Sequence, residues 1–220
     1  MNRMNRLHQF ALTFFILCNI GIAKAQNRID NLEPVSGIFY MHDYRFEYYT
    51  KVRKVLLNGL SEKPEIRFQG MPSFSPEYVL DIEFDKTNDQ YFIIFHISKP
   101  KISNNDKKWD EFQVLKFKTK IDKASVILIK SLFSAALAQV KYPPPVKEGE
   151  MIFLGLDGET FYFFADDKSG TVWSPPKGSK MSKLVAIGNK LIELAQSEKE
   201  IVKFDDELKK EITELIDALK

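Results

Sequence analysis

Apolar and polar residues alternate along parts of the first half of the chain, which is the pattern of a strand with one buried face. The clearest example is 78–85, where aromatic and aliphatic residues alternate with one valine and three acids. Residues 112–119 alternate in the same way, whereas 91–97 are apolar on both faces. Together with a short strand at 65–69, these segments predict a meander in which 91–97 lies centrally.

Proline and glycine residues mark the predicted turns. Pro72 and Pro76 predict an irregular loop after the first strand, because proline cannot donate a hydrogen bond to a central ladder. Later, the pair Asp157-Gly158 separates two apolar runs at 151–156 and 159–165. This pair is the strongest short signal for a β-hairpin.

Four further segments repeat apolar residues at the spacing of a helix. They are 44–60, 122–140, 179–195 and 205–219. The second is the most apolar, so we expect it to be buried against the sheet. Asp122, Ser179 and Asp205 or Asp206 are expected to cap the last three helices. Gly188 lies within an apolar stripe, which indicates a close backbone approach.

These patterns predict an α+β fold. The expected architecture is a mainly antiparallel sheet, a meander plus the Asp-Gly hairpin, packed against a buried apolar helix and C-terminal amphipathic helices. We expect residues 26–220 to form a single domain, or two packed lobes that divide near 141–150. Three consecutive prolines at 143–145 would supply a stiff spacer there.

The first 25 residues show the pattern of a secretory signal peptide. Basic residues and no acid precede an apolar run at 10–22, and small residues precede the expected cut before Gln26. A retained anchor would need about 20 apolar residues, and this run is shorter and contains Asn19. A lipid anchor on Cys18 would need a small residue just before it, but residues 15–17 are Phe-Ile-Leu. We therefore expect an exported protein, periplasmic or extracellular.

Removing this leader changes the charge of the chain. The leader holds three basic residues, so the totals of 32 basic and 30 acidic residues become 29 and 30. A nearly neutral mature chain gives no electrostatic reason to expect nucleic acid or a membrane as partner. Cys18 is the sole cysteine and leaves with the leader, so the mature chain is expected to have no disulfide.

Catalytic and metal-binding motifs are scarce in the mature sequence. Its histidines are His42 and His96, and neither belongs to a metal-ligand motif such as H-E-x-x-H. His96 is expected to be a hydrogen-bonded core residue, whereas His42 beside Asp43 is a weak candidate for a base and its orienting acid. No nucleophile elbow, P-loop or dinucleotide fingerprint is present. We therefore expect no metal and no other cofactor.

Carboxylates are the remaining catalytic candidates. Asp81, Glu83 and Asp85 share one strand face at a spacing of about 6–7 Å, a separation that suits a glycosidase pair. Such pairs normally face each other across a cleft, so we interpret this row as a solvated surface. The spacing of the acidic residues at 157, 166 and 167 matches no EF-hand calcium loop. We expect these residues to stabilise the turns in which they lie.

Two aromatic-rich stretches could provide a binding surface. Residues 39–49 include six aromatics, more than one strand and one helix can bury, so some would stack on a sugar or pack against a protein. The alternative is a core with tyrosine hydroxyls at its boundary. Trp173 either plugs the gap between sheet and helix or joins the helix N-terminus at 179–182 in an anion or ligand pocket. The candidate binding residues are Tyr40, Tyr44, Arg45, Trp109 and Trp173.

These observations favour a secreted or periplasmic, non-enzymatic binding or interaction module. Its expected ligand is an unknown protein or a glycan. One alternative is a carboxylate-dependent hydrolase that uses His42 with Asp43 or the acidic row. Another is an inhibitor or immunity-type partner of a secreted enzyme. The sequence names neither the ligand nor the oligomeric state.

Overall fold

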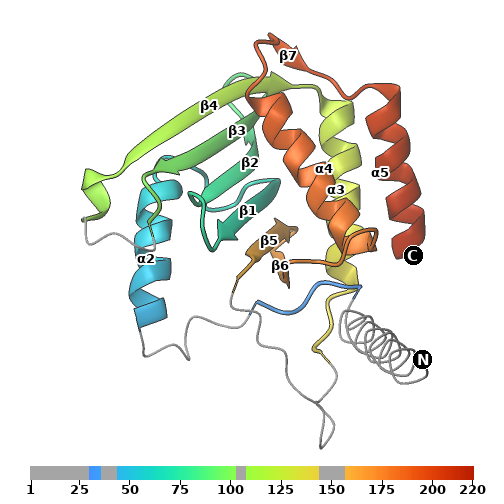
Figure 1. Ribbon diagram of the computed structural model, residues 1–220. Helices are drawn as coiled ribbons and strands as arrows, with labels where there is room; N and C mark the ends of the chain where they lie inside the picture. Colours follow the sequence, from blue (N-terminus) through green and yellow to red (C-terminus); the bar gives the residue numbers. More distant parts are fainter. Residues whose placement is uncertain (1–29, 36–43, 103–107, 144–156) are drawn as a thin grey trace, which may run out of the picture.

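Helices cover both faces of a seven-stranded sheet in the computed structural model of the chain (Figure 1). The structure describes residues 30–35, 44–102, 108–143 and 157–220. Three helices, α3, α4 and α5, lie on one face, and α2 lies on the other. The predicted α+β class is confirmed.

The strands form an open sheet in the order β6-β5-β1-β2-β3-β4-β7. Every neighbouring pair is antiparallel except β4 and β7, which are parallel. The bounds are β1 Ile66–Pro72, β2 Tyr78–Asp85, β3 Gln90–Lys99, β4 Gln113–Ile121, β5 Glu159–Ala165, β6 Lys168–Trp173 and β7 Ile201–Val202. The predicted meander is β1 to β4, and strands from both halves of the chain share this sheet.

The hairpin of the second half turns at Asp166 and Asp167. Both residues have positive φ, 52° and 60°, which is the backbone of a type I′ turn and is tolerated by aspartate. The expected hairpin at Asp157-Gly158 involves 151–156, which lie outside the described residues. Strand β5 has β1 along one edge and β6 along the other, so the described hairpin is β5–β6.

Strand β1 continues through Pro72, where the sequence predicted an irregular loop. Its pairing with β2 ends at Gly70, whereas its pairing with β5 continues to Pro72 opposite Glu159. The proline therefore takes the last position of the strand, where its missing N–H interrupts no ladder with β2.

The last three helices begin directly after the predicted capping residues. The helix bounds are α2 Tyr44–Leu56, α3 Lys123–Ala138, α4 Lys180–Ala195 and α5 Asp206–Leu219. Asp122, Ser179 and Asp205 each accept hydrogen bonds from backbone N–H groups of the first turn. Helix α2 ends four residues before the predicted Leu60, and Gly59 follows it with a φ of 86°.

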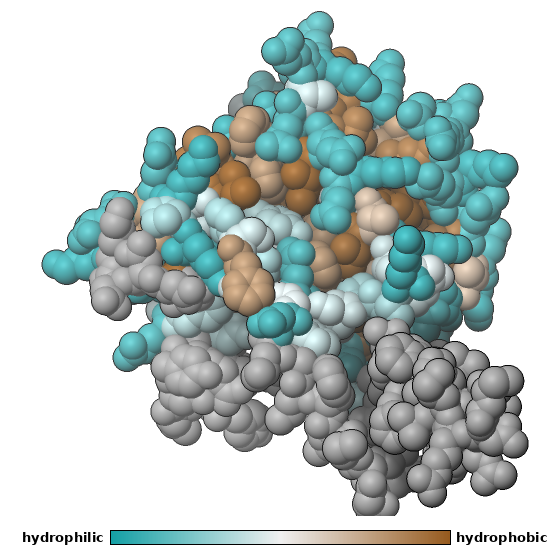
Figure 2. All heavy atoms as spheres, in the orientation of Figure 1, coloured by the Kyte–Doolittle hydropathy of each residue, from teal (hydrophilic) through white to brown (hydrophobic). Residues whose placement is uncertain are grey.

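Two apolar cores hold these layers together. The larger core fills the space between the sheet and α3, α4 and α5, and the smaller lies under α2. In the view of Figure 2, apolar side chains gather between β4 and α5, while hydrophilic side chains project at the outer rim. Gly188 of α4 lies against Phe68, where an added Cβ would sit 2.6 Å from a ring carbon. The predicted close approach is confirmed.

Candidate functional site

The structure describes the side chains of two of the five candidate binding residues. Tyr40 lies outside the described residues. Tyr44 and Arg45 form the first turn of α2, but their side chains lie outside the described part. Trp109 belongs to a short 3-10 helix, Trp109–Glu111, before β4, and Trp173 ends β6.

The two tryptophans do not form one site. Strands β5, β1, β2 and β3 lie between β6 and β4, which corresponds to roughly 24 Å at the usual strand spacing. Both indoles are 46 % exposed, so exposure alone does not indicate which of them belongs to a binding site. The residues around each ring distinguish the two.

Trp173 lies against the backbone at the start of β5. A Cβ on Gly158 would sit 2.7 Å from its indole carbons, so the ring covers this glycine at the start of β5. With almost half of its surface in solvent, Trp173 does not plug a gap between sheet and helix, which corrects one of the two interpretations of this residue.

Trp109 borders a shallow groove of about 260 Å³. The groove lies between the last turns of α2, the 3-10 helix and the start of β4. Its polar residues are Lys54, Asn58, Asp110 and Lys116, and its apolar residues are Val55, Trp109, Phe112 and Val114. An exposed indole among ammonium, amide and carboxylate groups can stack on a ring or an apolar side chain while the polar groups orient the ligand.

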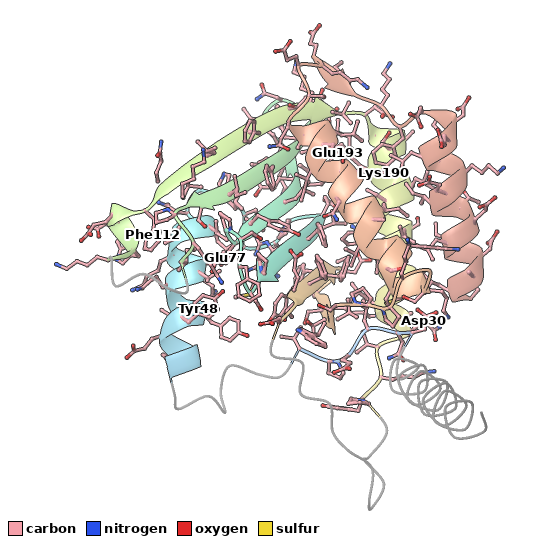
Figure 3. All side chains as sticks on the ribbon, in the orientation of Figure 1. Asp30, Tyr48, Glu77, Phe112, Lys190 and Glu193 are labelled. Atoms are coloured by element: carbon pink, nitrogen blue, oxygen red, sulfur yellow. The ribbon has the colours of Figure 1, made fainter. Side chains whose placement is uncertain are left out.

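The smaller core fixes the shape of this groove. Val52, Val55 and Leu56 of α2 are buried together with Phe112, which enters between α2 and β4 (Figure 3). On the surface, Lys116 Nζ donates to the carbonyl of Asn58 at 3.1 Å. The end of α2 and the start of β4 are therefore joined both by apolar packing and by a hydrogen bond.

A second concavity, of about 310 Å³, lies near the β2–β3 turn. The rings of Phe84 and Tyr91 form one wall, with centroids 4.7 Å apart, and Ile201 adds apolar surface. Its carboxylates come from Asp89 and Asp122, and that of Asp122 already accepts from the first turn of α3. This group is committed to capping, and the sequence analysis did not single out this concavity.

The acidic row of β2 is not a uniformly solvated surface, as the sequence analysis expected. Asp81 is fully buried, and its carboxylate accepts from Arg67 Nε at 2.8 Å and Nη2 at 2.6 Å. Burial raises the pKa of Asp81 to about 6, partly offset by the Arg67 guanidinium. The expectation fails for Asp81 because Arg67, opposite it on β1, supplies the partner that burial requires.

The other two members of the row have local partners. Glu83 accepts from the backbone N–H of Ser61 at 2.5 Å. Asp85 accepts from Thr87 N–H and from the Asn88 amide, and these bonds hold the pKa of its carboxyl below the usual value. The three carboxylates therefore support separate local structures and do not converge in a cleft.

Glu77, which the sequence analysis missed, is a fully buried carboxylate next to α2. It accepts from Tyr48 OH at 3.0 Å and from Ile102 N–H at 2.7 Å, and the Ser98 hydroxyl lies 3.4 Å away (Figure 3). These contacts tie α2 to β3 and to the segment after it. No sequence signal separated Glu77 from a surface glutamate, because its partners come from three distant segments.

The described part of the aromatic stretch 39–49 contributes mainly to the boundary of the smaller core. Tyr48 and Tyr49 are half-buried, and their hydroxyls bond to Glu77 and to Tyr162. Phe46 remains 48 % exposed. The interpretation as core residues with boundary hydroxyls therefore holds for the two tyrosines.

The N-terminus of α4, a candidate anion pocket, is occupied by the chain itself. The carboxylate of Asp30 accepts from Met181 N–H at 3.0 Å, and the Ser179 hydroxyl accepts from Ser182 N–H at 3.0 Å (Figure 3). The alternative of an anion pocket at this helix N-terminus is therefore corrected, because the Asp30 carboxylate and the Ser179 hydroxyl already accept from N–H groups of the first turn.

The one histidine that the structure describes is a core residue. His96 is buried, and its Nδ1 lies 2.8 Å from the carbonyl of Leu56. Burial lowers the pKa of its imidazole. His42 and Asp43 lie outside the described residues. Within the described ranges, no cluster of three or more potential ligand residues could hold a metal, and no helix has the length and apolarity to cross a membrane.

Comparison with known proteins adds no family. No protein-family model, curated protein or solved structure matches this chain. The function is therefore inferred from the geometry of the site.

Proposed function

We propose that the chain is an exported, non-enzymatic binding module whose ligand docks in the Trp109 groove. The observation that carries the proposal is the combination found there: a half-exposed indole among two lysines, an amide and a carboxylate. Half-exposed aromatic residues with polar neighbours are typical anchors of recognition sites.

The partners of the buried carboxylates favour binding over catalysis. A carboxylate-dependent hydrolase needs a carboxyl group that reaches substrate from a cleft. Asp81 and Glu77 are fully buried and bonded to protein groups. An inhibitor or immunity-type partner of a secreted enzyme is the special case in which the ligand is one tightly bound protein.

The proposal is tested by capture on immobilised protein from the medium or periplasmic extract of the producing organism. We expect the ligand retained by the wild type to be lost with Trp109→Ala and retained with Trp173→Ala, because the two rings are equally exposed but one of them borders the groove. Phe74→Ala is the control for removing an exposed aromatic ring, since Phe74 is 79 % exposed.

The result is interpreted only for variants whose melting temperature stays close to that of the wild type. A ligand that all three variants retain would contradict the proposal, and so would one lost with Trp173→Ala alone.

A further inference from the structure

The outer edge of β4 has no strand partner along most of its length in the described part of the chain. Strand β4 pairs with β3 at every position, and on its other side β7 pairs with Lys120 and Ile121. Figure 1 shows β4 along the rim of the sheet, with β7 at its far end. The outward backbone groups of 113–119 are therefore open to another extended chain.

One contact identifies which backbone groups point outward. The N–H of Asp122, just after β4, donates to the carbonyl of Val202 at 3.1 Å. Successive residues of an extended strand direct their N–H and C=O groups to alternate edges. The groups of Val114, Lys116 and Lys118, at even separations from Asp122, therefore point to the same outer rim.

This rim carries positive charge on the face that α2 covers. Lys116, Lys118 and Lys120 alternate along β4 and are exposed. Lys118 Nζ lies 4.2 Å from the centroid of the Phe92 ring, and Lys116 Nζ bonds to a carbonyl. Among the described residues none of the three lysines pairs with a carboxylate. The stripe therefore has no neutralising partner there.

The Trp109 groove opens at the end of this rim. Val114 and Lys116 line it and are also two of the residues whose backbone points outward. An extended chain paired with β4 would therefore pass the lysines and reach the groove on the same face.

We propose that the ligand of the groove is an extended acidic peptide segment that adds to the β4 edge as a further strand. This inference rests on the proposed function and names its partner. In the antiparallel arrangement, which is the more stable one, two acidic side chains at alternate positions stand opposite Lys118 and Lys116. An apolar side chain two residues later stands opposite Val114, beside Trp109.

Charge disfavours the most obvious competing occupant, a second copy of the chain. Lysines on an edge strand oppose pairing with an identical edge, because like charges would stand about 5 Å apart across the pair. The same lysines favour a segment with carboxylates in register.

The test measures peptide binding by the fluorescence of Trp109 in the full chain carrying Trp173→Phe, which leaves Trp109 as its single tryptophan. The probe is a nine-residue peptide in which Glu, Glu and Leu stand at alternate positions separated by Thr. One control peptide has the same composition with the two Glu and the Leu made adjacent. A second carries N-methyl groups on the amides that would face β4. We expect both controls to bind at least tenfold more weakly.

Two substitutions at one position separate charge from backbone pairing. Lys118→Ala removes the charge and is expected to weaken binding about fivefold, as for an exposed ion pair. Lys118→Pro also removes the outward N–H and is expected to weaken binding about fivefold further. The proline leaves the ladder with β3 intact, because that N–H points away from β3. Lys183→Ala, on the exposed face of α4, is the matched control and should bind as the parent does.

Three results would overturn the inference: no binding of the patterned peptide, equal binding of the reordered peptide, or equal binding by Lys118→Pro and Lys118→Ala. If capture from extract nevertheless depends on Trp109, the proposed function stands and strand addition alone fails. If capture does not depend on Trp109, the proposed function fails as well.

Discussion

At the scale of single residues, the fold depends most on positions where a neighbouring side chain fills all the available space or supplies the one partner of a buried charge. Gly188 and Asp81 are the two clearest cases. Gly188 must lack a side chain because the Phe68 ring occupies that space. The Asp81 carboxylate can be buried because Arg67 lies opposite and donates hydrogen bonds to it. Each leads to a measurement.

Gly188→Ala is expected to lower the free energy of unfolding. The new Cβ would lie 2.6–2.8 Å from three carbons of the buried Phe68 ring. Such overpacking costs about 1–3 kcal/mol, while the better helix propensity of alanine returns about 1 kcal/mol. Urea unfolding should show a net loss. Ala186→Gly, at an exposed position of the same helix, measures propensity alone, and Phe68→Leu should relieve the loss. An unchanged or raised stability in Gly188→Ala would contradict this expectation, because it would show that α4 can shift away from Phe68 at no cost in free energy.

The stability of the wild type relative to Asp81→Asn is expected to fall as the pH rises. The pKa of Asp81 is about 6 in the fold, against an unfolded value of about 3.9. A raised carboxyl pKa gives a contribution that is complete below the unfolded pKa and is lost as the pH rises through the folded pKa. The advantage of the wild type should therefore shrink by about 2 kcal/mol between pH 4 and pH 7.

Urea unfolding of both proteins at the two pH values measures this difference, and the comparison cancels His96 and the other titrating groups. An advantage that grows with pH would mean that the attraction of Arg67 outweighs burial.

At the scale of elements, helix starts depend on single carboxylates and hydroxyls. Asp30 acts across the longest sequence separation among the described side-chain contacts, because it reaches α4 from the segment at 30–35, before α2. Asp30→Ala should cost about 1 kcal/mol of stability, and the Met181 amide should exchange its hydrogen faster. Asp30→Asn keeps an acceptor oxygen and should behave like the wild type. Unchanged exchange at Met181 in Asp30→Ala would contradict this role.

How far elements could be predicted depends on whether the signal is local. The caps at Asp122, Ser179 and Asp205 were predicted because capping depends on residues within one turn. The strand β2 was predicted with its observed bounds, since its alternation is contained within eight residues. The extension of β1 to Pro72 was missed, because it depends on a partner almost 90 residues away.

The candidate site was predictable only in part for the same reason. Trp109 was singled out as an aromatic residue in a polar loop, but the lysines and the amide around it come from α2 and β4. The burial of Asp81 and Glu77 likewise requires partners on other elements. Alternation placed Asp81 on the polar face of its strand, and only the arrangement of α2 and Arg67 shows that this face is covered there.

At the scale of the whole molecule, stability rests on the two apolar cores. The chain has a single cysteine and therefore no intrachain disulfide. The larger core uses side chains from β1 to β7 and from three helices, whereas the smaller one depends on α2. The Trp109 groove lies on the smaller core, so ligand binding there is expected to stabilise the packing of α2 on the sheet.

The central claim, that the ligand covers Trp109 and not Trp173, is tested most directly by protection from oxidation. Both indoles are 46 % exposed, so N-bromosuccinimide should oxidise them at similar rates in the free protein, as followed by mass spectrometry of the two tryptophan peptides. With the captured ligand bound, oxidation of Trp109 should slow while that of Trp173 does not change. Protection of Trp173 alone, or of neither ring while the ligand is bound, would contradict it.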